Sequence, residues 1–437
     1  MQPTIAIIGA GASGLGVAKA LKECGLAFEI IEATRRFGGN WQPDGPASKM
    51  YASVHLISSR RNTQFADFPM PDDYPAYPRH DQVFDYLTQL AEHHGLAAHT
   101  RFDTRVTHMD KDAGGWQLTF ADGSQSRYDA VVVCNGLLGV PTTPEYPGHF
   151  SGTALHARDY RGAEQLRGQR VLVVGGGNSG CDIAVDAAQV ARRALHSTRR
   201  GYHYMPKFID GQPTQEWLMD QAPKFSDEDA YWAHVERSFK FAGFDGRDYG
   251  LPAPDHDIRE CHPILNSQIL YYIGHGDLQA KPDIQRFDGN QVYFSDGSVE
   301  TVDVIVWATG YAIDLPFLPC EVFDWRRDFD DLFLRMLPAR HDDLVFVGYL
   351  NTPSGIGNLA NMTGRFVAAC LQARAADSPA WRQLLQIKQR PGDLDLGQQR
   401  FMQTRRHAHE VDLWKFIRTL NFLTARLQQN PPQARSA

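Results

Sequence analysis

Two glycine-rich turns, each placed between an apolar run and a helix-like segment, constrain the fold of this chain most. The first, Gly9-Ala-Gly11-Ala-Ser-Gly14, follows residues 5–8, and the second, Gly175-Gly-Gly177-Asn-Ser-Gly180, follows residues 171–174. In such turns the first glycine permits a tight bend, the second lets a diphosphate approach the backbone, and the third lets helix and strand pack closely. The diphosphate then lies at the positive end of the helix dipole. The sequence therefore predicts an α/β fold with two Rossmann-like dinucleotide-binding domains.

The residues at the end of the next strand differ between the two turns. After the first turn, a strand over residues 28–31 leads to Glu32, and a carboxylate there accepts hydrogen bonds from a ribose diol while repelling a 2′-phosphate. This site suits FAD. After the second turn, the equivalent strand leads to Ser197, Thr198, Arg199 and Arg200. Because guanidinium groups bind phosphate oxygens well, the second site is predicted to hold NADPH rather than NADH.

A gapless internal repeat extends this duplication. Residues 119–136 align with residues 293–310, and each copy reads as a hairpin with an Asp-Gly turn, followed by a buried strand that ends at a glycine. We expect nested domains: an FAD-binding domain formed by residues 1–154 and 286–400, and an inserted NADP-binding domain over residues 155–285. The strand before Gly310 is expected to return the chain to the first domain. Residues 204–262 read as an aromatic-rich insertion, and residues 401–437 as a helical extension that packs on the core or on a second subunit of a homodimer.

Composition excludes several other classes of protein. The chain has 437 residues and a formal net charge of −7, and it lacks the basic stripe that nucleic-acid binding requires. Its six cysteines include no C-x-x-C pair, which argues against a zinc site, a disulfide framework and a dithiol reductase, and no spacing suggests any other metal site. The absence of a signal sequence and of a long apolar run favours a cytoplasmic protein without a membrane partner.

Between the two turns, Phe150, Gly152, His156, Tyr160 and Arg161 occupy the fixed positions of a known fingerprint. Phe-x-Gly-x-x-x-His-x-x-x-Tyr/Phe-Lys/Arg is the pattern of flavin-containing monooxygenases, and the chain resembles that family over nearly its whole length. Further matching stretches are 50–51, 65–69, 248–256, 262–263 and 308–311. Related Baeyer–Villiger enzymes carry Trp at the aromatic position, so Tyr160 favours oxidation of nitrogen and sulfur.

The resemblance implies a reaction and a set of cofactor contacts. NADPH would reduce FAD, O₂ would add to give a C4a-hydroperoxyflavin, and a soft nucleophile (a small amine or sulfide) would take one oxygen atom. Gly38-Gly39-Asn40-Trp41 resembles the Gly-Gly-x-Trp that closes over the flavin in this family. Cofactor contacts are expected at Gly9, Gly11, Ala12, Ser13, Gly14, Glu32, Asn40, Trp41, Val106, Gly136, Gly175, Gly177, Asn178, Ser179, Gly180, Ser197, Thr198, Arg199, Arg200, Ala308, Thr309 and Gly310.

One position departs from the family pattern. Where the family has an asparagine implied to stabilise the oxygenated flavin, this chain has Ile57, whose side chain forms no hydrogen bond. Either His55, Ser58 or Asn62 takes over that role, or the enzyme releases hydrogen peroxide. The alternatives to a monooxygenase of amines and sulfides are therefore an NADPH oxidase or flavin reductase, a Baeyer–Villiger oxygenation of ketones, and a non-catalytic nucleotide-binding module.

Overall fold

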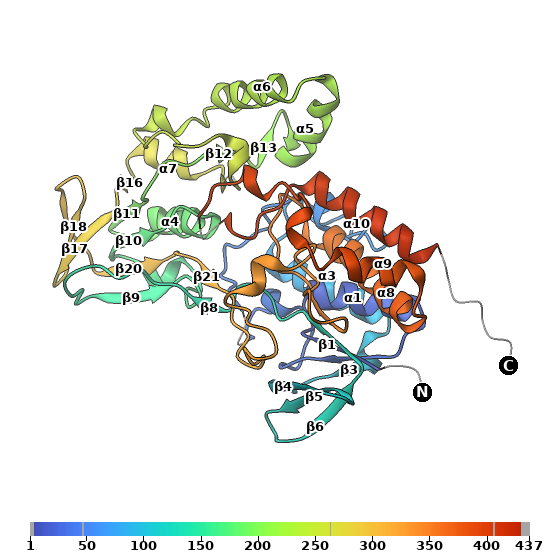
Figure 1. The fold of residues 1–437 in the computed structure, drawn as a ribbon. Helices are drawn as coiled ribbons and strands as arrows, with labels where there is room; N and C mark the ends of the chain where they lie inside the picture. The colour runs from blue at the N-terminus through green and yellow to red at the C-terminus, as the bar shows by residue number, and fades with distance from the viewer. Residues whose placement is uncertain (1–3, 46–47, 263, 405–406, 430–437) are drawn as a thin grey trace, which may run out of the picture.

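The two glycine-rich turns belong to two separate parallel sheets in the computed structural model, which describes residues 4–45, 48–262, 264–404 and 407–429 (Figure 1). The strand order is β22-β7-β1-β2-β3 in the first sheet and β16-β11-β10-β20-β9 in the second. In both sheets the strand before the turn lies between the strand after the helix and the finishing strand of the repeat. This arrangement confirms a duplicated dinucleotide-binding fold.

The first sheet is covered on both faces, as expected for a parallel sheet built from apolar runs. Its strands are β1 (Ile5–Ile8), β2 (Phe28–Ile31), β3 (Thr100–Arg101), β7 (Ala130–Val133) and β22 (Leu344–Phe346). One face carries α1 (Ala12–Glu23), α3 (His80–His93) and α8 (Ile356–Ala375), and the other carries the meander β4 (Val106–Asp112), β5 (Gly115–Phe120) and β6 (Gln125–Tyr128). A Cβ atom on Gly16 would lie 2.4 Å from the Ala360 carbonyl oxygen, so α1 and α8 pack this closely because Gly16 has no side chain.

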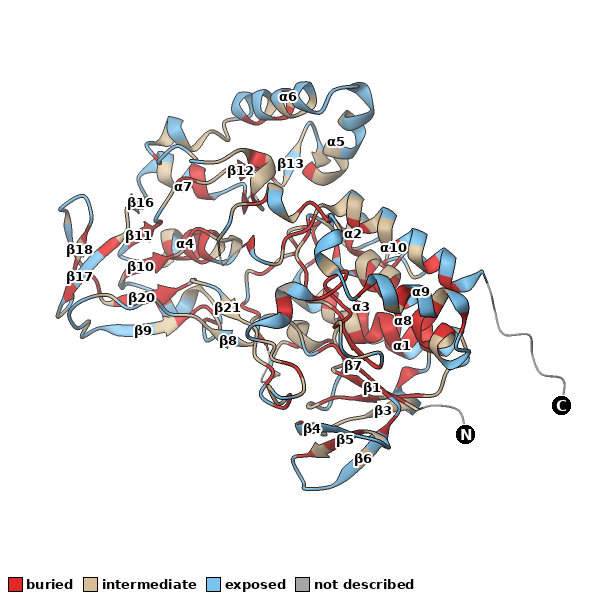
Figure 2. Ribbon diagram, viewed as in Figure 1, coloured by how far each residue is buried: buried red, intermediate tan, exposed pale blue. Residues whose placement is uncertain are grey.

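The second sheet repeats this plan. Its strands are β9 (Thr153–His156), β10 (Arg170–Val174), β11 (Arg193–Ser197), β16 (Leu278–Lys281) and β20 (Val304–Trp307). Helices α4 (Asn178–Val190) and α7 (Ile269–His275) pack on one face, and the meander β17 (Ile284–Asp288), β18 (Gln291–Phe294) and β19 (Val299–Thr301) packs on the other. Figure 2 shows the central strands of both sheets buried.

The expected domain boundary at residues 285 and 286 is wrong. Strand β20 pairs in parallel with β10 on one side and β9 on the other, so Val304–Trp307 belongs to the second sheet, and the meander β17-β18-β19 packs on that sheet. The physical reason is that Val304–Trp307 is buried throughout and needs neighbours on both edges, which the second unit itself supplies. The chain returns to the first sheet with β22. The two crossings between the units, β8 (Val140–Pro141) and β21 (Tyr311–Ala312), pair antiparallel with each other.

The remaining elements lie outside the two sheets. The expected insertion contains β12 (Tyr204–Met205), β13 (Phe208–Ile209), β14 (Gln212–Pro213), α5 (Thr214–Gln221) and α6 (Glu228–Phe241), and β15 (Ile264–Leu265) follows it. It has a small core of its own that includes Met205, Trp217 and Phe239. The other helices are α2 (Arg60–Thr63), α9 (Pro379–Ile387) and α10 (Leu413–Gln428). The expected C-terminal helix is confirmed over α10, which buries Phe416 and Leu420 in the core shared with α8, and residues 430–437 lie outside the described residues.

Candidate functional site

The first and third glycines of each turn are required by the protein itself. A Cβ atom on Gly14 would lie 2.0 Å from the Gly9 carbonyl oxygen, and one on Gly180 would lie 1.9 Å from that of Gly175. Gly9 and Gly175 have φ angles of 105° and 122°, which side chains disfavour. Each turn also contacts the finishing strand of its own unit, because a Cβ on Gly175 would lie 2.3 Å from the Ala308 carbonyl oxygen.

No steric contact or backbone angle within the protein requires the second residue of each turn to be glycine. A Cβ atom on Gly11 would lie 3.6 Å from the nearest described atom, Gly39 Cα, and one on Gly177 would meet nothing within 4 Å. Their φ angles, −78° and −79°, suit any residue, and they begin α1 and α4 without a side-chain cap. Open space beside an uncapped helix start is where a diphosphate fits. Both turns therefore fit dinucleotides on their own geometry.

Glu32 is held rigidly beside the first turn. Its buried carboxylate accepts a hydrogen bond from the Ala10 N–H at 2.8 Å, and two from the N–H and hydroxyl of Thr34 at 2.9 and 2.7 Å. Two carboxylate oxygens provide about four acceptor sites. Capacity therefore remains for the hydroxyls of a ribose, which fits the predicted FAD contact.

The segment Gly39–Trp41 forms a 3₁₀ turn against the first glycine turn. A Cβ atom on Gly39 would lie 2.9 Å from Gly11 Cα, so this segment closes directly over the turn. Asn40 Oδ1 is buried without a hydrogen-bond partner in the described part of the chain, as expected of an acceptor that a bound molecule satisfies. Trp41 packs against the cores of both units. Of the other expected contacts, Val106 begins β4, and Gly136 follows β7 with a φ of 86°.

The residues predicted to bind NADPH lie together at the carboxyl ends of β11, β10 and β20. Some of their side chains already form hydrogen bonds within the protein. Asn178 Oδ1 accepts a hydrogen bond from the Leu265 N–H at 2.9 Å, and Ser197 Oγ donates to the Pro282 carbonyl at 2.6 Å. Thr309 donates its hydroxyl to the Thr142 carbonyl. Each of these three side chains therefore has one structural hydrogen bond, which orients it at the carboxyl edge of the sheet.

Arg199 and Arg200 follow β11, which ends at Ser197. Arg199 is exposed, and Arg200 is half-buried with Nη1 3.8 Å from the Met402 sulfur. Gly310, after β20, has the same φ of 86° as Gly136, so the two units also match at this position.

The three polar candidates in the segment after Tyr51 each form a hydrogen bond inside that segment. His55 Nδ1 lies 2.9 Å from the Ser53 carbonyl oxygen, Ser58 Oγ lies 2.7 Å from Thr63 Oγ1, and Asn62 Nδ2 donates to Ser59 Oγ at 3.0 Å. All three polar candidates are thus hydrogen-bonded within their own segment. Ile57 packs against the core of the insertion.

Two aspartates on α4 that the sequence analysis missed, the half-buried Asp182 and the buried Asp186, join the units. Tyr51 donates its hydroxyl to Asp182 at 3.2 Å, and the fingerprint residue Tyr160 donates to Asp186 at 2.8 Å. Ser53 also donates to Asp186, at 2.7 Å. Burial raises the pKa of both carboxyls. The charge of Lys207 and hydrogen bonds from Asn266 and Tyr51 oppose that rise at Asp182, and hydrogen bonds from Ser53 and Tyr160 oppose it at Asp186. Their spacing of four residues, on one side of an otherwise apolar helix, was the available signal.

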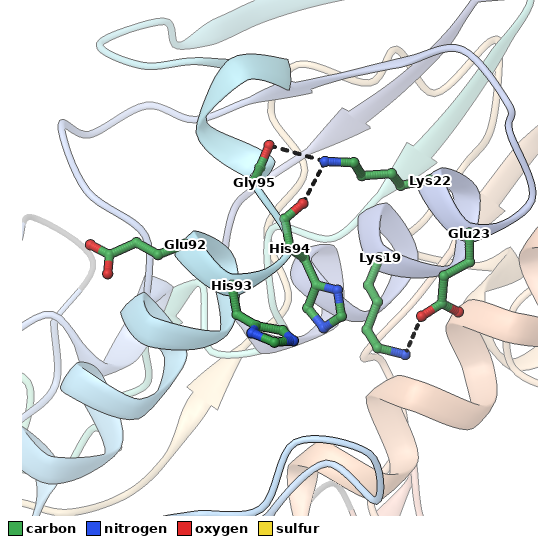
Figure 3. Close-up of a pocket in the computed structure, with 7 residues that line it drawn as sticks. All are labelled: Lys19, Lys22, Glu23, Glu92, His93, His94 and Gly95. Carbon is green, nitrogen blue, oxygen red and sulfur yellow. Dashed lines mark hydrogen bonds and ion pairs between the residues drawn. The ribbon is translucent and has the colours of Figure 1, made fainter.

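The histidines at the end of α3 lie in a different place. His93 and His94 line a hollow of about 430 Å³ with Lys19, Lys22, Glu23, Glu92 and Gly95 (Figure 3). Lys19 forms ion pairs with Glu23 at 2.9 Å and Asp67 at 2.5 Å, and Lys22 donates to the His94 carbonyl at 2.6 Å. Among the described residues, no cluster of His, Cys, Asp or Glu is suited to hold a metal ion. The two lysines that line the hollow are therefore explained by their ion pairs and hydrogen bonds within the protein.

Within the described part of the chain, none of the helices has the length and apolar character that crossing a membrane requires.

Comparison with known proteins gives consistent matches. Residues 2–431 match a family model described as flavin-binding monooxygenase-like. Flavin-containing monooxygenase 3 of Rattus norvegicus is 32% identical over 367 residues, covering 78% of this chain and 68% of the relative, and that of Homo sapiens is 30% identical over 398 residues, covering 85% and 74%. Among solved structures, S-allyl-L-cysteine S-oxygenase of Allium sativum superposes with a TM-score of 0.69 at 22% identity (99% and 90% covered). A cyclohexanone monooxygenase superposes with a TM-score of 0.73 at 16% identity (97% and 98% covered). The last two likenesses concern the fold.

Proposed function

Because this chain belongs to the flavin-binding monooxygenase-like family, we propose that it transfers one oxygen atom from O₂ to a small amine or sulfide at the expense of NADPH. The observation that carries the proposal is the pair of second glycines, Gly11 and Gly177, each of which starts an uncapped helix and has room for a Cβ atom within the protein. Two such sites in one chain fit a resident flavin and its reductant. Bound FAD would supply the redox and oxygen-activating chemistry.

The first turn, Glu32 and the Gly39–Trp41 segment would hold the FAD. Glu32 accepts from the ribose, the start of α1 carries the diphosphate, and Asn40 Oδ1 offers an unused acceptor. Trp41 packs between the two units and excludes water from the space between the nucleotide sites. These residues bind and shield, and none of them needs to act as an acid or a base.

The second turn would hold NADPH, with its 2′-phosphate on Arg199 and Arg200. Tyr160 supports oxidation of nitrogen and sulfur over ketones, because the resemblance implies Trp at this position in Baeyer–Villiger enzymes. In this structure its hydroxyl donates to the buried Asp186. The decisive experiment supplies a tertiary amine, a thioether and a cyclic ketone in turn, and measures oxygenated product and hydrogen peroxide per NADPH consumed. Product from the amine or the thioether supports the proposal. Product from the ketone alone would indicate a Baeyer–Villiger enzyme.

An NADPH oxidase is the second candidate, and Ile57 favours it. If the enzyme releases peroxide, Ile57→Asn is expected to lower the peroxide formed per NADPH, because an amide donor then stands at that position. Ile57 packs against the insertion core, so burying an amide there is expected to cost about 1–3 kcal/mol of stability and to lower the Tm. Ile57→Leu, which adds no donor, is the matched control.

Peroxide release and Tm would be measured on all three proteins. Should Ile57→Asn leave peroxide release unchanged although the variant folds and binds FAD, position 57 does not control it. His55, Ser58 and Asn62 would then be tested next.

A further inference from the structure

A short segment of the first unit is buried inside the second unit. Residues 50–54, which we call the docked segment, follow the first glycine turn in the chain. Three of its side chains nevertheless belong to the hydrophobic core that α4 shares with β10 and β20: Met50, Tyr51 and Val54. The Ala52 N–H also donates to the Arg161 carbonyl at 2.9 Å, so the backbone of the docked segment is bonded to the second unit as well.

Two side-chain hydrogen bonds connect the docked segment to α4. Tyr51 donates its hydroxyl to Asp182 Oδ2 at 3.2 Å, and Ser53 donates to Asp186 Oδ2 at 2.7 Å. The two acceptors are four residues apart, so they lie one above the other on the same face of the helix. The docked segment therefore runs along that face and is bonded to it at two successive turns.

α4 is the helix that carries the second nucleotide site. It begins at Asn178, directly after Gly177, where the diphosphate of a dinucleotide fits. An α-helix has about 3.6 residues per turn, so Asp182 and Asp186 lie roughly one and two turns from that site on the same rigid element. A bond from the first unit to these aspartates thus fixes the position of the helix on which the dinucleotide lies.

The chain beyond the docked segment leads to the flavin side of the first unit. Residues 55–63 pack against the start of α8, because a Cβ atom on Gly355 would lie 1.9 Å from the Asn62 carbonyl oxygen. Gly348, between β22 and α8, lies against the first glycine turn, since its Cβ would lie 2.5 Å from Ser13 Oγ. One continuous stretch of chain therefore connects α4 with the part of the first unit that surrounds the predicted FAD.

The rate of hydride transfer and the affinity for NADPH depend on this connection differently. Hydride transfer requires the reacting atoms to lie about 3–3.5 Å apart, and a displacement of about 1 Å can lower a rate 100-fold. Affinity for NADPH is instead assigned to the second glycine turn, Arg199 and Arg200, all within the second unit. A shift of α4 relative to the first unit should therefore slow hydride transfer and leave NADPH binding nearly intact.

We propose that Tyr51 and Ser53 are positioning residues for flavin reduction: their hydrogen bonds to Asp182 and Asp186 hold the nicotinamide at the distance from the flavin that hydride transfer requires. In that step NADPH is oxidised to NADP⁺, and its hydride, two electrons with one proton, reduces the flavin. This inference rests on the proposed function, since it requires FAD on the first turn and NADPH on the second.

The test is anaerobic reduction of the FAD-loaded protein by NADPH in a stopped-flow instrument. This measurement separates the rate constant of reduction at saturating NADPH from the Kd for NADPH. The variant Tyr51→Phe/Ser53→Ala removes both hydroxyls but leaves each aspartate a donor from the second unit, Asn266 at 2.7 Å or Tyr160 at 2.8 Å. Its rate constant is expected to fall about 10- to 100-fold, with the Kd nearly unchanged.

Two further measurements require no turnover. NADP⁺ added to the dithionite-reduced protein should give a weaker charge-transfer absorbance in the double variant than in the native protein, because the two rings no longer lie at the native distance. Hydrogen–deuterium exchange of the oxidised protein should be faster in the docked segment of the variant. Ser53→Thr retains a hydroxyl and should reduce at nearly the native rate, whereas Ser53→Ala should not.

Tyr146→Phe/Ser238→Ala is the matched control, because it removes the same two hydroxyls away from the junction. Tyr146 donates to Asp283 at 2.8 Å beside the second sheet, and Ser238 donates to the His234 carbonyl at 2.9 Å within α6. The rate constant and the Kd of this control should equal those of the native protein. Tm and FAD content establish that each protein is folded, and the two single variants carry the same test if the double variant is not.

The outcomes distinguish this inference from the proposed function. A native rate constant in the double variant, an equal fall in the control, or a raised Kd with an unchanged rate constant would overturn the inference and leave the proposed function standing. If NADPH does not reduce the flavin of the native protein at all, the proposed function fails and the inference fails with it. Because oxygen and substrate are absent, neither result depends on what the enzyme oxygenates.

Discussion

Replacing Gly11 with valine is expected to yield a folded protein that no longer retains FAD. A Cβ atom at this position meets nothing closer than Gly39 Cα at 3.6 Å, and the φ of −78° suits valine. The protein therefore tolerates the side chain, whereas a diphosphate on the start of α1 would collide with it. The measurements are the absorbance of bound flavin after purification, reconstitution with added FAD, and the Tm of the flavin-free protein.

Gly14→Ala is the matched comparison for this prediction. Its Cβ atom would lie 2.0 Å from the Gly9 carbonyl oxygen, so this smaller change is expected to destabilise the fold itself. The contrast identifies the cause of flavin loss: a Gly11→Val protein with a normal Tm and no flavin indicates a collision with the cofactor. Full flavin content in Gly11→Val would show that the diphosphate does not lie on this turn.

Replacing both Arg199 and Arg200 with alanine is expected to raise the KM for NADPH about 10- to 100-fold and to leave the KM for NADH nearly unchanged. The estimate comes from the loss of charge-assisted hydrogen bonds to a 2′-phosphate, about 1.5–3 kcal/mol in all. Because Arg199 is exposed, the loss should shrink as salt concentration rises. Steady-state flavin reduction by each cofactor at two ionic strengths measures this effect.

Arg237→Ala provides the control, since Arg237 is an exposed arginine of α6 on the insertion. It should leave both KM values unchanged. Equal increases for NADPH and NADH in the double variant would show that the two arginines do not recognise the 2′-phosphate, and the preference for NADPH would need another explanation.

The sequence predicted the parts of the fold that are determined by residues close together in the chain. The turns at Gly9–Gly14 and Gly175–Gly180 are defined by steric contacts within a few residues, and the repeat at 119–136 and 293–310 appears as two hairpins, each followed by a buried strand. The strand before Gly310 was assigned to the wrong sheet because an apolar run does not specify which neighbours it pairs with. Only the pairing of β20 with β10 and β9 decides that.

The site was harder to predict wherever a side chain's partner lies far away in the chain. Asn178 was expected to contact the cofactor, but its side chain accepts from Leu265, 87 residues later. The spacing of Asp182 and Asp186 on an apolar helix was a signal, but their partners cannot be identified from the sequence of that helix alone. The role of the two aspartates depends on Tyr51 and Tyr160, which come from other segments of the chain and donate hydrogen bonds to them.

The antiparallel pairing of β8 and β21 places the two covalent connections of the second unit side by side. The chain leaves the first unit and re-enters it side by side, and the Gly139 N–H donates to the Ala312 carbonyl at 3.0 Å. A domain whose two ends meet can be gained or exchanged without disturbing its host, as domain insertions in general show. Exchange of this unit would also have to restore the hydrogen bonds from Tyr51 to Asp182 and from Ser53 to Asp186, because these bonds join the units away from the paired strands.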